Sequence, residues 1–449
     1  MKIPQSLISS LQNIKGFNEN AFVYTHENEA SSIAVRINPF KKTDTFNHAE
    51  SVIWSEYGKY LPDNYQVTFD PLFHAGAYCI QEASSMYLAQ MLKSSVDLSQ
   101  DLKVLDLCAG TGANSTLLAS LLTPDSLLVS NDVLKVRANV LAENLTKWGT
   151  INTIVTNNDP RDFMRLSGFF DVLLIDAPCS GSGLFRKDPN TIREWSVGNV
   201  AQHALRQKSI ITDAWGSLKQ GGVMIYSTSS YSKAENEDIV DWIETQFGAE
   251  HLVAKNEDKL GNEVISEGSY RFYPDQVKGE GFFITAFQKR SSEKEVFIRS
   301  GKPIKNNNRR TEREIFRNWV KNIDDHTWFG KNDDFFLINP LHEHIIHLIQ
   351  LNFNLRKVGV SMGKLSSKDL IPDHELAMSL FLSEKINKVE LSQQEAIKYL
   401  KREEFALEQA VKGWSLMTFQ GFGLGWAKIL PNRINNYYPK EQRILGKES

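Results

Sequence analysis

Two strand-like segments of the chain end in residues that can carry out nucleophilic chemistry. The segment FDVLLIDAPCSG places Asp176, Pro178 and Cys179 directly after an apolar run. A second run, GGVMIYST, leaves a Gly-Gly turn and ends just before Ser229. A thiol with a pKa of about 8.5 is partly ionised at pH 7, whereas a hydroxyl needs a dedicated base. No histidine lies close to Ser229 in the sequence to act as that base.

A third segment, DLCAGTGANST, has the form of a ligand-binding turn. Gly110 and Gly112 let the backbone approach a ligand, which then faces the N-terminus of the following helix. Later strand candidates are followed by Asp132, Asp159 and Asp176, which suit the ribose and adenine of S-adenosylmethionine. A dinucleotide-binding dehydrogenase has a similar turn, and acidic residues also occur at strand ends without a ligand. The predicted cofactor contacts are Cys108, Ala109, Gly110, Thr111, Gly112, Ala113, Asn114, Asp132, Asp159 and Asp176.

Apolar runs and helical patterns alternate around these segments. Strand candidates lie at 103–107, 127–130, 151–155, 171–175, 222–226 and 281–287. Helical patterns lie at 115–122, 133–147, 198–217 and 235–247. This alternation predicts an α/β fold with a parallel, doubly wound sheet and helices on both faces. Ligands in such folds bind at the carboxyl ends of the strands, so we expect the three segments to meet in one crevice.

Length and composition describe an ordinary globular protein. A chain of 449 residues is too long for one core and predicts two to four domains. No run of about 18 apolar residues is present, and the N-terminus lacks the features of an export signal. The three cysteines, Cys79, Cys108 and Cys179, match no zinc motif and fit a reducing cytoplasm. We therefore expect a cytoplasmic monomer with no metal site and no membrane partner.

Two basic regions favour an RNA partner. Residues 289–317 carry ten Lys and Arg against four Glu, a local charge of +6 in a chain whose net charge is −3. This asymmetry favours a polyanion-facing, loop-like segment, and a solvated linker is the simpler alternative. Near the C-terminus, cations alternate with aromatic residues, which suits phosphate contact with base stacking. A core tyrosine pair with a solvated basic edge fits the same residues, which are Lys428, Arg433, Tyr437, Tyr438, Lys440 and Arg443.

Taken in order, these segments resemble the RNA cytosine-C5 methyltransferases of the Sun and RsmF type. SSIAVRINPF at 31–40, the three segments above and GWSLMTFQGFGLGWAKI at 413–429 carry the resemblance. It implies a class I, Rossmann-like, S-adenosylmethionine-dependent methyltransferase domain flanked by RNA-binding α+β modules, and methylation of carbon 5 of cytosine in ribosomal RNA. The implied units are an N-terminal RNA-binding and cofactor-capping region (1–95), the methyltransferase domain (96–290), a basic linker (291–320) and a PUA-like module (321–449).

The same resemblance assigns roles at the substrate site. In this family the cysteine that attacks the pyrimidine ring stands where this chain has Ser229. The resemblance gives Cys179 the release step and Asp176 the support of the flipped base, and it places Lys187 within reach of the active site.

The serine leaves several interpretations open. In the first interpretation, the chain is a catalytically silent RNA-binding or ribosome-assembly factor. In the second, Cys179 attacks the ring in place of the missing cysteine. In the third, Ser229 is an introduced replacement. Methyl transfer to a different substrate is a further alternative. The cofactor loop also departs from the family, because Ala113 replaces a glycine and Asn114 replaces a lysine. The second change removes a cation near the expected cofactor carboxylate.

Overall fold

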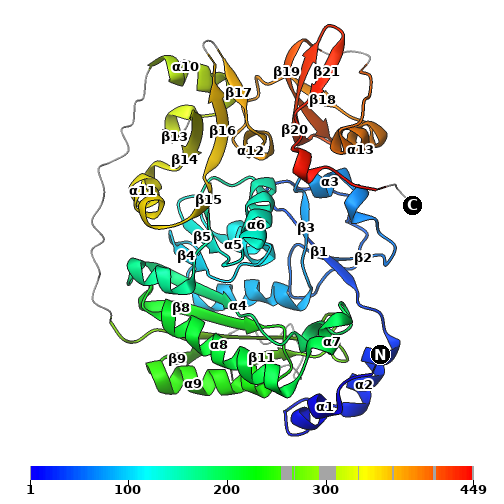
Figure 1. Cartoon of the computed structure of the whole chain (residues 1–449), viewed down its shortest axis with the longest axis vertical. Coiled ribbons are helices and arrows are strands. Elements are labelled where there is room, and N and C mark those ends of the chain that lie inside the picture. The colour runs from blue at the N-terminus through cyan, green and yellow to red at the C-terminus, as the bar shows by residue number, and fades with distance from the viewer. Residues whose placement is uncertain are drawn as a thin grey trace.

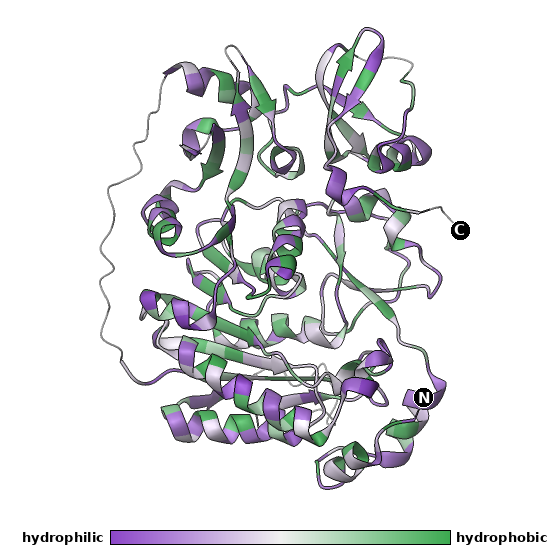
Figure 2. Cartoon of the chain, viewed as in Figure 1, coloured by the Kyte–Doolittle hydropathy of each residue, from purple (hydrophilic) through white to green (hydrophobic). Residues whose placement is uncertain are grey.

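The computed structural model describes residues 2–253, 265–266, 268–292, 310–331, 333–366, 369–407 and 411–446. A large mixed sheet occupies the middle of the molecule, with the C-terminal sheets at one end and the first two helices at the other (Figure 1). Hydrophobic residues gather in the strands and on the inner faces of the helices (Figure 2).

The central sheet contains ten strands. They are β4 (Lys103–Asp106), β5 (Leu127–Asn131), β6 (Thr153–Thr156), β7 (Phe170–Asp176), β8 (Leu218–Thr228), β9 (Glu250–Leu252), β10 (Ile265–Ser266), β11 (Ser269–Phe272), β12 (Phe282–Gln288) and β15 (Leu355–Val358). The strand order is β10-β11-β12-β8-β7-β4-β5-β6-β15, and β9 pairs with β12. The five strands from β8 to β6 run parallel, as predicted.

Both edges of the sheet differ from the fully parallel prediction. Strand β12 runs antiparallel to β8, and β15 runs antiparallel to β6. The sequence predicts buried strands from apolar runs, but such runs do not encode strand direction. The pairing of β15 also joins residues about 200 positions apart, which no local pattern indicates. The sheet is therefore mixed, while the predicted α/β class is confirmed.

Helices cover both faces of the sheet. The helices of this region are α4 (Leu88–Ser95), α5 (Ala113–Leu121), α6 (Lys135–Trp148), α7 (Asn190–Glu194), α8 (Val197–Trp215), α9 (Glu237–Phe247) and α11 (Glu343–Asn352). Successive strand side chains point to opposite faces, so Leu105 and Leu173 pack under α8, α9 and α11. Val104 and Val172 pack on the other face under α4 and α5. The two apolar layers fix the strand ends in space.

The N-terminal region covers loops that leave the central sheet. It contains α1 (Gln5–Leu11), α2 (Glu19–Asn28) and α3 (Pro71–His74), with a three-stranded sheet of β1 (Ile33–Ile37), β2 (Gly58–Leu61) and β3 (Tyr78–Ile80). Side chains of α1 and α2 pack against Phe185 and Tyr231, which lie just beyond β7 and β8. The first two helices therefore brace the loops that carry the candidate site.

The C-terminal region adds two four-stranded sheets. The first contains β13 (Thr327–Lys331), β14 (Asp334–Ile338), β16 (Val360–Leu365) and β17 (Leu370–Pro372). The second contains β18 (Lys388–Glu390), β19 (Gly413–Phe419), β20 (Phe422–Leu430) and β21 (Arg433–Asn436). Their helices are α10 (Arg310–Trp319), α12 (His374–Met378) and α13 (Gln393–Lys401). None of the helices in the described ranges is long and apolar enough to cross a membrane.

One buried lysine joins all three regions. The Nζ of Lys41 donates to the backbone carbonyls of Ala75 at 2.9 Å, Lys147 at 2.6 Å and Met378 at 2.8 Å. These acceptors belong to the N-terminal region, the end of α6 and the end of α12. The domain boundaries implied by the sequence stay a prediction, but this contact shows that the regions pack tightly together.

Candidate functional site

Asp176 lies where β7 and β8 end side by side. In the strand register it is opposite Ser227, whose hydroxyl donates to its Oδ1 at 2.8 Å. The Nδ2 of Asn114 donates to the other carboxylate oxygen at 3.0 Å. Burial raises the pKa of Asp176 to about 6, although both hydrogen bonds favour the ionised form. At pH 7 this group is therefore mostly a carboxylate.

A chain of buried hydrogen bonds connects Asp176 to the N-terminal sheet. The side-chain oxygen of Asn114 accepts from Gln81 Nε2 at 3.2 Å. The side-chain oxygen of Gln81 accepts in turn from Arg36 Nε at 2.7 Å. Arg36, on β1, also donates to Thr116 of α5 at 2.6 Å. Asn114 thus links the N-terminal region to the Asp176 carboxylate.

The glycine turn before α5 opens toward solvent on one side and packs on the other. Both Gly110 (φ 58°) and Gly112 (φ 95°) adopt the left-handed backbone region. A Cβ at Gly112 would lie 2.7 Å from Leu141 Cδ1, whereas no atom lies within 4 Å of the Cβ position at Gly110. Asp132 holds the turn, because its Oδ2 accepts from the Gly110 N–H at 3.1 Å. Gly110 therefore faces space that a ligand can enter.

The turn is surrounded by uncompensated negative charge. Asp106 is fully buried, Ser115 donates to its Oδ2 at 2.6 Å, and its Oδ1 has no partner among the described residues. Burial, together with the nearby Asp176 and Asp132, raises the pKa of Asp106 to about 7. Burial and the same three carboxylates also raise the pKa of the Cys108 thiol. S-adenosylmethionine carries a sulfonium and an ammonium group, so its charge fits this acidic surface.

The other predicted cofactor contacts lie at this turn, apart from Asp159. The N–H of Ala109 donates to the Asn131 carbonyl at 2.8 Å, and Ala113 begins α5. Thr111 is exposed beside them. The Asp159 carboxylate caps a 3-10 turn and pairs with the exposed side chain of Arg161 at 2.9 Å. The contact of Asp159 with adenine therefore stays a prediction.

Cys179 and position 229 lie directly beside each other. The backbone N–H groups of Gly181 and Ser229 lie close to the Cys179 sulfur and lower the pKa of its thiol. The Ser229 carbonyl accepts from the Gly183 N–H at 2.9 Å, so the loop after β7 is bonded to the loop after β8. Lys187, further along the first loop, is exposed to solvent. The two strand ends meet as the fold predicts, whereas the role of Lys187 stays a prediction.

Neither nucleophile candidate is activated in this structure. Burial raises the pKa of Cys179 to about 12, with Glu235 and then Asp176 adding to it, while the two N–H groups oppose the rise. The Ser229 side chain is half-exposed, and within the described ranges its hydroxyl makes no hydrogen bond. The thiolate is therefore rare at neutral pH, and the hydroxyl has no base.

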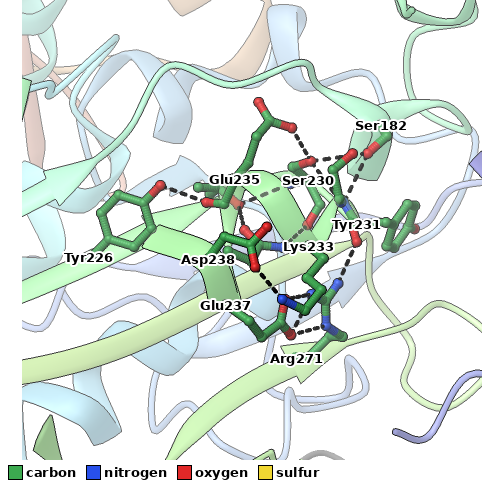
Figure 3. A network of polar contacts seen from close by, with 12 residues as sticks. Ser182, Tyr226, Ser230, Tyr231, Lys233, Glu235, Glu237, Asp238 and Arg271 are labelled. Atoms are coloured by element: carbon green, nitrogen blue, oxygen red, sulfur yellow. Dashed lines mark hydrogen bonds and ion pairs between the residues drawn. The ribbon is translucent and has the colours of Figure 1, made fainter. Parts of the chain in front are cut away.

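Glu235 is the residue of this site that the sequence did not reveal. Its carboxylate is fully buried between the two loops, in the polar network of Figure 3. The sequence places it six positions after Ser229, at the foot of a helix, where an acidic residue usually means a helix cap. The only hint in the sequence is that Glu235 comes after both serine-rich strand ends. That position alone does not identify a site residue.

The basic C-terminal residues fall into a core part and an exposed part. Tyr438 is only 1% exposed, and its hydroxyl lies 3.4 Å from His74 Nδ1, so the core interpretation is right for this tyrosine. Tyr437 is 44% exposed and packs against Trp414, whose ring also lies under Lys428. An open groove of about 850 Å³ lies beside this face. Its cationic and aromatic lining residues are Arg402, Phe405, Arg433, Tyr437, Tyr438 and Lys440.

The basic stretch at 289–317 is only partly within the described residues. Residues 293–309 lie outside them, including Arg309. The described end is a helix, α10, and not the predicted loop. Arg313 and Arg317 on this helix both form ion pairs with Asp324. These cations are therefore less available to a polyanion than the sequence suggested.

Comparisons with known proteins agree with this architecture. Family models match residues 93–288 (16S rRNA methyltransferase RsmB/F), 3–83 (N-terminal domain of 16S rRNA methyltransferase RsmF) and 386–444 (methyltransferase RsmF PUA domain). A ribosomal RNA small subunit methyltransferase F from Shewanella woodyi is 31% identical, over 82% of this chain and 78% of its own length. The protein of that name from an Escherichia coli strain is 27% identical, over 83% of this chain and 79% of its own length.

Solved structures show the same fold. NSun6 from Pyrococcus horikoshii, solved with the S-adenosylmethionine analogue SFG, has a TM-score of 0.54 at 18% identity. The match covers 64% of this chain and 99% of that one. A methyltransferase homologue from the same organism has a TM-score of 0.51 at 25% identity, covering 64% of this chain and 100% of that one.

The mixed sheet, the glycine turn and the acidic strand ends define a class I methyltransferase of the S-adenosylmethionine-dependent type. The matched segments then specify the group within that class. The chain belongs to the RsmF family of 16S rRNA methyltransferases.

Proposed function

We propose that this protein methylates carbon 5 of a cytosine in 16S ribosomal RNA, and that Cys179 is the nucleophile. The observation that supports this role is the position of the Cys179 sulfur, which lies against the backbone of Ser229 at the ends of two adjacent parallel strands. A thiol at this place can approach the ring that the missing cysteine would otherwise attack. The relatives named above are small-subunit rRNA methyltransferases, which supports the choice of substrate.

Carbon 5 of cytosine is a poor nucleophile, so the ring needs activation. A thiolate that adds to carbon 6 makes carbon 5 electron-rich. After methylation, the carbon-5 proton passes to a water molecule or hydroxide, and the thiolate leaves carbon 6. S-adenosylmethionine, when bound at the glycine turn, supplies the methyl group. The N–H groups of Gly181 and Ser229 lie close to the Cys179 sulfur and favour its ionised form. Because the pKa of this thiol is raised to about 12, we expect methyl transfer to be slow at neutral pH.

Asp176 is placed to orient the base. It is mostly ionised at pH 7, and Ser227 and Asn114 each hold one of its oxygens. A carboxylate has further lone pairs, so it can accept a hydrogen bond from the exocyclic amino group of a cytosine. A uracil has no such donor, and this difference favours cytosine as the target.

The flanking regions would hold the RNA. A target base in structured RNA has to leave its stack to reach the half-buried Cys179 thiol, which costs a few kcal/mol. Contacts away from the base supply that free energy. The exposed Tyr437, Arg433 and Lys440 at the C-terminal groove offer base stacking and phosphate contacts. A ribosomal RNA substrate also supports a cytoplasmic location.

The test is methyl transfer from labelled S-adenosylmethionine to 16S rRNA and to small subunits, with bisulfite sequencing of the product. We expect wild type to be active, with a rate that rises about tenfold per pH unit between pH 7 and 9 because only the thiolate reacts. Cys179→Ala should abolish transfer, and Ser229→Ala should leave it nearly unchanged.

Two results would contradict this assignment. Full activity of Cys179→Ala would show that another group attacks. An inactive wild type whose activity appears in Ser229→Cys would show that the natural chain is a silent RNA-binding factor on an intact methyltransferase fold.

A further inference from the structure

One buried carboxylate holds the residues that follow both nucleophile candidates. Glu235 Oε1 accepts from the Ser180 N–H at 2.7 Å, and its Oε2 accepts from the Ser180 hydroxyl at 2.6 Å. The same Oε2 accepts from the Ser230 hydroxyl at 2.5 Å (Figure 3). Ser180 directly follows Cys179, and Ser230 directly follows Ser229. The loop after β7 and the loop after β8 therefore share one anchor.

Two neighbours hold the anchor itself, and a third holds the loop that contains Ser230. Tyr226 on β8 donates its hydroxyl to the backbone carbonyl of Glu235 at 2.7 Å. Gln207 on α8 donates to the Glu235 carboxylate at 3.5 Å and to the Pro178 carbonyl at 3.1 Å. Asn236 donates to the Ser230 carbonyl at 2.8 Å. Elements on one face of the sheet thus converge on these two loops.

This carboxylate has no cationic partner in the part of the chain that the structure describes. Its charge is balanced by hydroxyl and amide donors alone. Burying an ionised group without a counter-ion is costly, and apolar side chains could join two loops at a lower cost. A role that needs an acceptor of fixed geometry explains why a carboxylate stands here.

We propose that Glu235 is a positioning residue, which locks the Cys179 loop to the Ser229 loop and so sets where the thiol lies relative to the target base. This inference rests on the proposed function, in which Cys179 attacks. It predicts that loss of the anchor lowers the rate of the chemical step and leaves cofactor binding intact, because the glycine turn makes no contact with Glu235.

The charge of Glu235 gives a second readout that folding alone would not change. The ionisable groups that face the Cys179 sulfur are Glu235, Asp176 at the end of β7 and Tyr226 on β8. Of the charged groups, Glu235 has the largest effect in raising the pKa of Cys179. Glu235→Gln keeps the shape of the side chain and removes the charge, so the pKa of Cys179 should fall.

The experiment compares wild type, Glu235→Gln and Glu235→Asp with Asp238→Asn. Asp238 is an exposed carboxylate of the same segment that pairs with Lys233 and contacts neither loop. Iodoacetamide labelling of Cys179 is followed against pH by peptide mass spectrometry, with Cys79 and Cys108 as internal references. In Glu235→Gln, labelling at pH 8 should be about tenfold faster for each unit by which the pKa falls. Glu235→Asp and Asp238→Asn should keep the wild-type pH profile.

Methyl transfer is measured on the same proteins. Glu235→Gln should lower kcat about tenfold or more at an unchanged KM for S-adenosylmethionine, because the loss from a misplaced thiol exceeds the gain from its larger thiolate fraction. Glu235→Asp should recover part of the loss, since it keeps the charge but is shorter. Wild-type labelling and wild-type kcat in Glu235→Gln would overturn the proposal. Labelling needs no RNA, so it tests Glu235 even where wild type transfers no methyl group.

A second variant covers the case in which Glu235→Gln does not fold. The double change Ser180→Ala with Ser230→Ala removes both hydroxyl donors and keeps the carboxylate and the Ser180 N–H donor. It should lower kcat to a similar extent, and a wild-type kcat in this variant would overturn the proposal equally.

Discussion

At the scale of single residues, Asp176 is a carboxylate that two neutral donors hold. These donors are Ser227 and Asn114, and no cation pairs with Asp176 among the described residues. Burial consequently leaves its pKa at about 6. A bound cation should then act as the missing partner, and this links cofactor binding to the protonation of Asp176.

S-adenosylmethionine binding should therefore release protons. A cation favours the ionised carboxylate, so affinity should fall as the pH drops through about 6. Calorimetry at pH 7.5 and 5.5, in buffers with different ionisation enthalpies, measures both the affinity and the released protons. S-adenosylhomocysteine lacks the sulfonium charge and should depend less on pH. Asp176→Asn should reduce the pH dependence, and an unchanged dependence in that variant would assign it to another group.

At the scale of elements, the turn between β4 and α5 has two glycines with different tasks. Both need a positive φ, but only Gly112 packs against α6. Gly110 faces open space. The same substitution at the two positions should therefore separate stability from ligand binding.

Gly112→Ala should destabilise the protein by about 2 kcal/mol or more, because the left-handed backbone and the contact with Leu141 both oppose a Cβ. Gly110→Ala should cost about 1 kcal/mol for its backbone alone. It should nevertheless weaken S-adenosylmethionine binding more, relative to its effect on stability, because its Cβ enters the ligand space. Urea denaturation and calorimetry measure the two effects, and equal losses of stability at both positions would contradict this account.

Sequence patterns predicted these elements well, because strands buried on both faces are short apolar runs. Strand β4 spans Lys103–Asp106 against a predicted 103–107, and β7 spans Phe170–Asp176 against 171–175. The patterns also indicated that Cys179 and Ser229 end adjacent strands. They could not reveal the Glu235 anchor or the contact between Asn114 and Asp176. Both depend on side chains that meet only after the sheet has formed, and spacing along the chain does not encode such contacts.

At the scale of the whole molecule, the C-terminal groove should contribute RNA affinity. Arg433→Glu with Lys440→Glu should weaken binding of 16S rRNA fragments and lower the slope of log affinity against log salt by about 0.7 per lost phosphate contact. Lys388→Glu with Lys398→Glu makes the same charge change on exposed residues of the same module, outside the groove. Equal salt slopes in both double variants would show that the groove cations are only solvated.

Helix α12, which Lys41 joins to the N-terminal region, should also make the stability of the protein depend on pH. Burial lowers the pKa of His374 from 6.5 to about 3, so the folded protein holds this ring neutral. The unfolded chain takes up a proton below pH 6.5, and the stability due to the neutral ring is lost as the pH falls. The free energy of unfolding should drop by about 1.4 kcal/mol per pH unit relative to His374→Asn. His48→Asn, at an exposed position, should behave as wild type in urea titrations at pH 7 and 5.

The attack by Cys179 is tested most directly by trapping. RNA with 5-fluorocytosine at the target position blocks the release step, because fluorine replaces the proton that has to leave. Wild type with S-adenosylmethionine should form an adduct that survives denaturation, and mass spectrometry should map it to Cys179. Cys179→Ala should form none. A wild type that binds this RNA and the cofactor but forms no adduct, or an adduct that persists in Cys179→Ala, would contradict the assignment of Cys179 as the nucleophile.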